Sequence, residues 1–277
     1  MRSVNHLTSL DNPRVKEIVR LREQRHRRRS GRFVVESVRQ ITRAMDAGLT
    51  PAAMMWCEGL LGGAADDVQR INDQAGQRSK EYRGFTVTEA LIRKMAYREN
   101  PQGVVGVFEQ PTWSLADVLG QVVQDGGMCL VAVGIEKPGN LGAMARSAAA
   151  AGAAGLVVAD GVVDCFNPNV IRASTGAVFS LPVVGGLTED LIPLFQEQGI
   201  NMVTAMPQAE VSCYDADLTG PLALIIGSED CGLASTWQQA GKPITIPMLN
   251  EAVDSLNASA AAAVLLFEAV GQRRHVK

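Results

Sequence analysis

The later part of the chain is a series of continuous apolar runs that alternate with helical patterns. Its unbroken apolar runs have the length and character of strands that are buried on both faces of a parallel sheet. Such runs lie at residues 128–133, 155–159 and 222–226, with a further strand predicted at 201–205 and a strand-like stretch at 178–184. Helical patterns stand between them at 138–151, after Asn167-Pro168, and at 188–198. This alternation predicts βαβ units and therefore an α/β fold.

The earlier part of the chain carries a second α/β pattern. Short apolar runs predict strands at 33–35, 52–56, 85–87 and 104–108, and periodic stretches predict helices at 38–47, 68–75 and 89–95. The first helix is predicted to begin at Asn12-Pro13, with proline in its first turn, and to continue through a run of arginines as far as Gly31. Together these elements predict a small α/β domain.

The join between the two patterns lies between Pro111 and Gly127. Pro111 is followed by a modest helical pattern at 115–123 and then by Asp125-Gly126-Gly127. Proline and paired glycines at a break in pattern mark a domain boundary. We therefore predict a first domain over 1–110, a linker over 111–126 and a second domain over 127–277.

The stretch 243–268 has the order of a ligand-binding segment. A β-branched run at 244–246 is stopped by Pro247, a polar loop follows, and a helix rich in Ala and Leu closes the segment. Loops of this kind offer free backbone groups, and small side chains allow close backbone approach. Ser255 is explained as a helix cap. Asn257 lies two residues later, where capping does not require it, so its position favours a role in a site.

Composition narrows the class of protein. Apolar residues make up 47% and aromatics 5%, which suits an α/β core. The five cysteines are scattered without C-x-x-C spacing, and the three histidines lie near the ends of the sequence. A disulfide framework and a metal site are therefore not expected. A location in the reducing cytoplasm is expected. The apolar run 260–267 is far shorter than the roughly 20 residues that span a bilayer, so no membrane association is expected.

Charge is distributed unevenly along the chain. Residues 1–40 hold eleven Lys and Arg against four Asp and Glu, whereas the remainder holds 15 against 25. A basic head on an acidic body indicates contact with a polyanion. Arg25, Arg27, Arg28 and Arg29 are the candidate RNA-binding residues, because guanidinium groups bind phosphates and stack on bases. The alternative is a solvated charged helix.

Individual side chains in the second domain stand out for their surroundings. Arg146 is a lone charge in a helix of small residues, and Glu229 follows directly after a buried strand, where open α/β sheets bind ligands. The alternatives are a solvated face for Arg146 and a helix N-terminal charge for Glu229. Arg172 is a candidate for RNA phosphate, or it pairs with Asp164 on the surface. Neither G-x-G-x-x-G nor a P-loop motif occurs.

Three segments, in order, carry a resemblance to a known family. They are NLGAMARSA at 140–148, IGSEDCGL at 226–233, and IPM at 246–248 with SLN at 255–257. FNPNVIRASTGAVFSLPV at 166–183 lies between the first two, and GRFVVESVRQI at 31–41 is similar to the entry of an amino-terminal domain. The chain resembles the SpoU/TrmH (SPOUT) class of RNA 2′-O-ribose methyltransferases across almost its whole length.

The resemblance implies a fold and an activity. It implies a carboxyl-terminal α/β domain with a deep trefoil knot, preceded by a small α/β RNA-binding domain. It further implies transfer of the methyl group of S-adenosylmethionine to a ribose 2′-hydroxyl, no metal, and a homodimer in which Arg146 reaches the partner's site. The separate amino-terminal domain favours 23S ribosomal RNA as substrate, in a branch that includes antibiotic-resistance enzymes. The alternatives are a tRNA 2′-O-methyltransferase and a non-catalytic RNA-binding or ribosome-assembly protein.

The resemblance also assigns residues to roles. The candidate catalytic residues that it implies are Arg146, Glu229, Asn257 and Ser255. The candidate cofactor-binding residues are Ala205, Gly227, Ile246 and Leu256. A guanidinium keeps its proton beyond about pH 12, so charge stabilisation is an easier role for Arg146 than proton abstraction. The sequence departs from the family at Lys137, where Asp is common, but it keeps every named catalytic residue.

Overall fold

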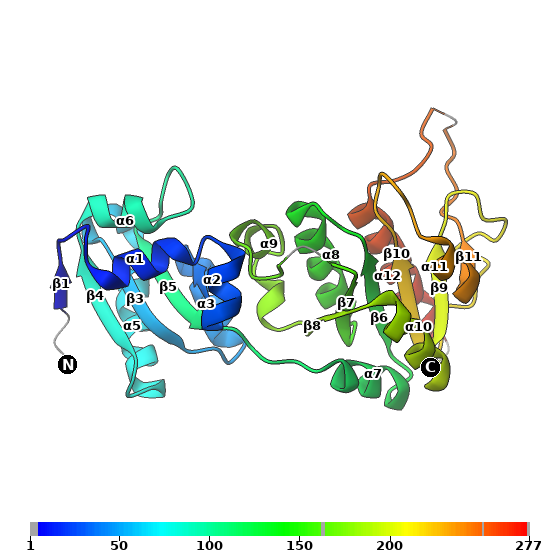
Figure 1. Cartoon of the computed structure of the whole chain (residues 1–277), viewed down its shortest axis with the longest axis horizontal. Helices are drawn as coiled ribbons and strands as arrows, with labels where there is room; N and C mark the ends of the chain where they lie inside the picture. The colour runs from blue at the N-terminus through cyan, green and yellow to red at the C-terminus, as the bar shows by residue number, and fades with distance from the viewer. Residues whose placement is uncertain (1–4, 162–163, 251, 276–277) are drawn as a thin grey trace. The chain divides into compact units, whose positions relative to one another are not determined.

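The computed structural model describes residues 5–161, 164–250 and 252–275. The chain divides into two compact units (Figure 1). The first comprises Met1–Pro111 together with Phe166–Ile171, and the second comprises Thr112–Cys165 and Arg172–Lys277. The segment 166–171, which the sequence places inside the second domain, therefore groups with the first unit. None of the described helices is long and apolar enough to cross a membrane.

The first unit is built on a mixed sheet. Its strands are β1 (Asn5–Leu7), β2 (Arg32–Val35), β3 (Pro51–Trp56), β4 (Arg83–Val87) and β5 (Val104–Glu109). They lie in the order β1-β4-β3-β5-β2, with β1, β4 and β3 parallel and β5 antiparallel to both of its neighbours. The strand β1 at the edge of this sheet is an addition to the sequence-based prediction.

Helices cover both faces of this sheet. They are α1 (Pro13–Arg20), α2 (Gln24–Ser30), α3 (Val38–Asp46), α4 (Glu58–Leu61), the 3₁₀ turn η1 (Gly62–Ala64), α5 (Ala65–Arg78) and α6 (Glu89–Met95). One core cluster joins Val15 and Ile18 of α1 to Leu91 and Ile92 of α6. The helices α3 and α5 contact each other, and α5 also packs on β3.

The basic stretch is two helices, so the prediction of one continuous helix is wrong. Asn12 caps α1, because its Oδ1 accepts a hydrogen bond from Arg14 N at 2.9 Å. The chain then turns at 21–23 before α2 begins, and Gly31 ends α2 with a φ of +64°. A left-handed residue at this position favours glycine.

Arg27 holds the turn between these helices. It is only 1% exposed, and its Nη1 donates to Leu21 O at 2.6 Å and to Arg22 O at 2.7 Å. A buried guanidinium bound to backbone carbonyls is not available to phosphate. This burial corrects the assignment of Arg27 to the RNA-binding residues.

Replacing Arg27 with methionine is expected to lower the free energy of unfolding by about 2 to 4 kcal/mol. The change would leave two carbonyls without their charge-assisted hydrogen bonds. Urea denaturation measures the effect, and Arg28→Met is the matched control. Arg28 is exposed on the same helix, so its loss should change stability by no more than about 0.5 kcal/mol. Equal stabilities for the two variants would contradict the role of Arg27 in the turn.

The second unit is built on a fully parallel sheet. Its strands are β6 (Met128–Val133), β7 (Gly155–Ala159), β8 (Val183–Gly186), β9 (Asn201–Ala205), β10 (Leu222–Ile226) and β11 (Lys242–Ile244). They lie in the order β11-β9-β10-β6-β7-β8, and every pairing between neighbours is parallel. The four strands predicted at 128–133, 155–159, 201–205 and 222–226 are present as β6, β7, β9 and β10.

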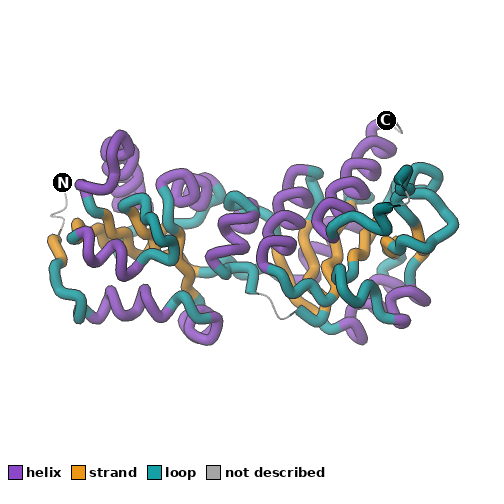
Figure 2. The backbone as a smooth tube through the Cα atoms, turned by 90° about the horizontal axis from the view of Figure 1, so that it is seen from above, coloured by secondary structure: helices purple, strands orange, loops and turns teal. Residues whose placement is uncertain are grey.

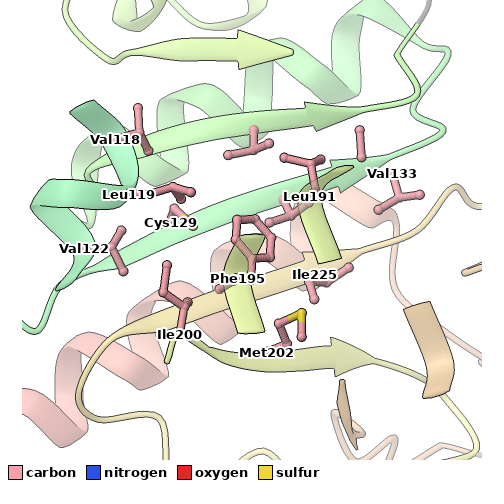
Figure 3. Packing of buried hydrophobic residues seen from close by; sticks show 14 of the residues in the cluster. Val118, Leu119, Val122, Cys129, Val133, Leu191, Phe195, Ile200, Met202 and Ile225 are labelled. Carbon is pink, nitrogen blue, oxygen red and sulfur yellow. The ribbon is translucent and has the colours of Figure 1, made fainter. Parts of the chain in front are cut away.

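Helices lie on both faces of this sheet too (Figures 1 and 2). They are α7 (Leu115–Gln124), α8 (Pro138–Ala150), the 3₁₀ turn η2 (Ala177–Phe179), α10 (Thr188–Glu197), α11 (Ser235–Ala240) and α12 (Ala258–His275). The short helix α9 (Pro168–Ala173) begins in the segment that groups with the first unit. One face carries α7, α10 and α11, and their apolar side chains form a common core with alternate residues of the strands (Figure 3). The helices α8 and α12 contact each other and pack on β6, β7 and β10.

The predicted linker contains part of this core. Val118, Leu119 and Val122 of α7 are buried in the same cluster as Cys129 of β6 (Figure 3). The segment 111–126 therefore helps to stabilise the second unit, and its helix, predicted over 115–123, is present.

Two predicted strands of the second unit differ from the structure. Residues 178–184 are not one strand, because Gly176, with a φ of +93°, leads into η2, and β8 begins only at Val183. The run is apolar because Val178 and Phe179 are buried in the 3₁₀ turn. The strand predicted at 244–246 instead spans 242–244, and Thr245 forms an isolated bridge with Ser212.

Candidate active site

A cavity of about 450 Å³ lies where three parallel strands end. Ala205, Ile226 and Ile244 are the last residues of β9, β10 and β11, and all three line it. The loops that follow these strands, residues 254–256 and the start of α12 contribute the rest of the wall. The volume lies within the roughly 300 to 1,000 Å³ of small-molecule sites. The carboxyl ends of the strands are also where open α/β sheets bind ligands.

The cavity gathers most of the residues that the sequence singled out in this domain. Its lining includes all four candidate cofactor-binding residues and two candidate catalytic residues. These are Ala205, Gly227, Ile246, Leu256, Glu229 and Ser255. The individual roles stay predictions, but the residues share one wall even though 51 positions separate Ala205 from Leu256.

Gly227 is the point of closest backbone approach in this wall. A Cβ atom at this position would lie 2.5 Å from the carbonyl carbon and oxygen of Gly232 and 2.8 Å from Leu233 N. The loop between them closes tightly, because Gly232 N donates to Ser228 O at 3.0 Å and Gly232 has a φ of +64°. The backbone therefore requires glycine at 227 to bring the loop against the strand end.

Glu229 is the centre of a polar cluster beside the cavity. Its Oε2 accepts a hydrogen bond from Lys137 Nζ at 2.7 Å. Its Oε1 accepts from Asn140 Nδ2 at 3.2 Å, from Asn257 Nδ2, and from the backbone N of Ala258 at 3.4 Å. Asn257 Nδ2 also donates to Asn140 Oδ1 at 3.2 Å. The cluster thus joins the start of α8, the loop after β10 and the start of α12.

Asn257 caps α12, which corrects the argument from sequence. The helix begins at Ala258, and the Oδ1 of Asn257 accepts from Ser259 N at 3.0 Å and from Ser259 Oγ at 2.6 Å. Capping therefore explains an asparagine at this position. A further role for Asn257 now rests on its contacts with Glu229 and Asn140 and not on a misfit with the helix.

Both charges of the Lys137–Glu229 pair are stabilised. The hydrogen bond with Glu229 raises the pKa of Lys137. The same bond lowers the pKa of Glu229, with further lowering by the Ala258 N–H and Asn140 and partial opposition from burial. Glu229 is therefore an ionised hydrogen-bond acceptor at neutral pH, and Lys137 is an ammonium.

Arg146 is not part of this cluster within the chain. It lies on α8, where Leu141, Met144, Ala145 and Ala148 form the buried stripe, and its own side chain is exposed. It does not line the cavity. No residue in the described part of the chain forms a hydrogen bond or ion pair with its guanidinium. Of the four candidate catalytic residues, Arg146 is thus the one that neither lines the cavity nor contacts the Glu229 cluster.

The candidate RNA-binding arginines differ in their environments. Arg25, Arg28 and Arg29 are exposed on α2, and none of them pairs with a residue that the structure describes. Arg172 is exposed near the end of α9 and has partners in the chain, so it is not a free cation. Arg27 is excluded by its burial.

Two members of the cluster were not selected from the sequence. Asn140 was quoted only as the first residue of a motif, and Lys137 only as a departure from a family pattern. Only their position could have indicated them, because Lys137 precedes Pro138 and Asn140 lies two residues after it, at the start of a helix that follows a buried strand. Among the described residues, no group of three His, Cys, Asp or Glu side chains gathers as a metal site would require.

The chain belongs to the SpoU rRNA Methylase family, whose pattern matches residues 127–267. An MRM3-like substrate binding domain matches residues 12–106. The resemblance seen in the sequence motifs is therefore confirmed, as is the α/β class of the fold. The trefoil knot that the resemblance implies stays a prediction.

Proteins similar to this one match between 76% and 99% of the chain. A 23S rRNA (uridine(2479)-2′-O)-methyltransferase of Streptomyces viridochromogenes is 32% identical over 89% of this chain and 85% of its own length. An rRNA methyltransferase of Sinorhizobium meliloti, solved with AdoMet bound, is 30% identical, with a TM-score of 0.83 over 99% of both chains. The RlmB 23S rRNA (guanosine-2′-O-)-methyltransferase of Xanthomonas axonopodis is 35% identical over 76% of this chain and 90% of its own.

Proposed function

We propose that this protein transfers the methyl group of S-adenosylmethionine to a ribose 2′-hydroxyl of ribosomal RNA, with 23S RNA as the substrate. The observation that carries the proposal is the strand-end cavity, which gathers the motif residues of a family whose relatives perform this reaction. The substrate-binding domain matched at 12–106 supports RNA over a small acceptor.

The cavity suits the cofactor in its chemistry. Its walls combine aliphatic side chains, such as Ile226, Ile244 and Leu256, with the backbone of three strand ends. Such walls accept an adenine ring and leave backbone groups to fix its orientation. Bound there, S-adenosylmethionine would supply an electrophilic methyl group. Ala205, Gly227, Ile246 and Leu256 are the residues that would hold it.

The protein groups act on the nucleophile and its charge. A ribose hydroxyl is a poor nucleophile, so it must be aligned with the methyl group and must lose its proton. The cluster around Glu229 would fix the loop 228–232 and the start of α12 in that alignment. Arg146 would stabilise negative charge on the ribose oxygen or clamp an adjacent phosphate.

We also propose a homodimer in which each Arg146 serves the partner's site. Its exposure and its separation from the cluster support this arrangement. In such a dimer, the Arg146 side chain of one subunit would complete the methyl-transfer site of the other.

The function is tested by incubating the full chain with labelled S-adenosylmethionine and separate pools of 23S, 16S and transfer RNA. Label should enter 23S RNA, and mapping of 2′-O-methyl groups should locate one nucleotide. Labelling of transfer RNA alone would favour the tRNA alternative. RNA binding without labelling of any pool would favour the non-catalytic alternative and contradict the proposal.

The exposed arginines of α2 are expected to bind RNA phosphates. Changing Arg25, Arg28 and Arg29 together to alanine should weaken RNA binding and reduce the slope of log K against log salt by about two units, since each contact contributes about 0.7. Filter binding over a range of salt concentrations measures the slope.

The matched control removes three other positive charges from the same unit. Lys16, Arg70 and Arg93 are each about half exposed and paired with a carboxylate. Their replacement by alanine should leave the slope almost unchanged. Equal slopes for both triple variants would make α2 a solvated helix and not an RNA contact.

A further inference from the structure

We propose that Lys137 is a positioning residue of the methyl-transfer site, because it fixes Glu229 in the orientation that joins the start of α8 to the start of α12. Lys137 lies outside the motif segments that carry the family resemblance. The proposal deepens the proposed function and rests on it for the catalytic part of its test.

The two oxygens of Glu229 are used for different purposes. Oε1 accepts from Asn140, Asn257 and the Ala258 N–H, all of which lie at the beginnings of helices. Oε2 accepts from Lys137 at 2.7 Å. With one oxygen held by the ammonium, the carboxylate plane is set, and the other oxygen is directed at the amide donors. Lys137 thus determines where the carboxylate lies, although it does not line the cavity itself.

This ion pair connects two separate segments of the second unit. Pairs such as Arg70–Asp67 and Arg93–Glu89 join residues within a single turn of one helix. Lys137 and Glu229 are 92 positions apart and connect two loops that follow neighbouring strands, β6 and β10. Pro138 is the first residue of α8, so the backbone at Lys137 is fixed beside it. Exposed pairs contribute little to stability, and the expected consequence here is one of geometry.

The charges around Glu229 give the proposal a pH signature. Lys137 lowers the pKa of Glu229, and in turn Glu229, with a smaller contribution from the adjacent Asp230, raises the pKa of Lys137. Asp254 is the other carboxylate in the cavity wall. When Lys137 is removed, the pKa of Glu229 should rise, because its first source of stabilisation is lost. If activity needs the ionised carboxylate, the acid limb of the rate profile should then move to higher pH.

The test compares Lys137→Met with Lys137→Arg and with Lys242→Met as a control. Lys242 is exposed on β11 of the same unit and lies outside the cavity wall. We expect Lys137→Met to lower kcat about tenfold, below the roughly hundredfold that a displacement of about 1 Å can cost. Its acid limb should shift upward and its KM for RNA should change little. Lys137→Arg should recover most of the rate, and Lys242→Met should match the wild type.

A second readout does not depend on activity. The carboxyl carbon of Glu229 can be followed by NMR in protein with ¹³C-labelled glutamate and assigned with Glu229→Gln. Its pKa should be higher in Lys137→Met than in the wild type. An unchanged Glu229 titration would overturn the proposal, and so would a folded Lys137→Met protein that loses rate with an unshifted acid limb. If the wild type methylates no RNA but the pKa of Glu229 is still higher in Lys137→Met, the proposed function is wrong and the positioning role stands.

Discussion

Arg146→Ala is expected to fold and to bind S-adenosylmethionine, but to methylate RNA on the order of a hundredfold or more slowly. The fold should survive because Arg146 is exposed and lies outside the buried stripe of α8. Cofactor binding should survive because Arg146 is outside the cavity wall. The rate should fall because a well-placed charge acts mainly on the transition state. Single-turnover methylation with saturating cofactor measures the effect.

The conservative variant separates shape from charge. Arg146→Lys keeps the charge but lacks the planar fork of the guanidinium, so it should recover little activity. Full activity of Arg146→Ala would remove this residue from the mechanism.

Mixing of subunits tests whether the site is shared. Arg146→Ala is combined with Asn257→Ser, which keeps an oxygen able to cap α12 but loses the amide that binds Glu229. If Arg146 acts in the partner's site, hybrids should recover part of the activity, because one of the two sites is complete. Two inactive variants that never complement each other would place both residues in the site of one subunit.

Elements whose burial is continuous were predictable from the sequence. The strands β6, β7, β9 and β10 lie inside a parallel sheet, so most of their positions are apolar and buried, and the apolar stretch itself marks the strand. Apolar runs that end in turns were misleading. Val178 and Phe179 are as buried as strand residues, but they belong to a 3₁₀ turn.

The break between α1 and α2 could not be predicted from local pattern. It depends on Arg27, whose side chain reaches back to the carbonyls of Leu21 and Arg22. Nothing in the run Arg27-Arg28-Arg29 distinguishes the arginine that is buried from those that are exposed. The distinction comes from tertiary packing, and it changes which residues are candidates for RNA binding.

The cofactor-binding residues of the cavity wall were assigned through the family resemblance, and the structure places them at the ends of strands and in the loops that follow or precede secondary-structure elements. Gly227 and Glu229 follow β10 directly, so their placement needs only the strand order. The polar cluster was harder, because Lys137 and Asn140 meet Glu229 only through the pairing of β6 with β10. In the sequence, Lys137 looks only like a departure from the family pattern. Once the pairing of β6 with β10 is known, it is a hydrogen-bond partner of Glu229.

Gly227→Ala is expected to reduce affinity for S-adenosylmethionine or its demethylated product on the order of a hundredfold. The added Cβ would meet the Gly232 backbone at 2.5 Å. Backbone cannot move aside as a flexible side chain can, so the loop 228–232 must shift away from the cavity. Overpacking of this kind typically costs about 1 to 3 kcal/mol, and the upper end of that range corresponds to about a hundredfold in binding.

Isothermal titration calorimetry on the full chain measures this loss, with Gly120→Ala as the matched control. Gly120 lies on α7 with no atom within 4 Å of its Cβ position, so alanine there should leave affinity unchanged and stabilise the helix slightly. Thermal unfolding of both variants distinguishes a local shift from a loss of fold. Because the strand end and the loop meet at Gly227 and both line the cavity, a folded Gly227→Ala protein with wild-type affinity would place the cofactor somewhere other than this cavity.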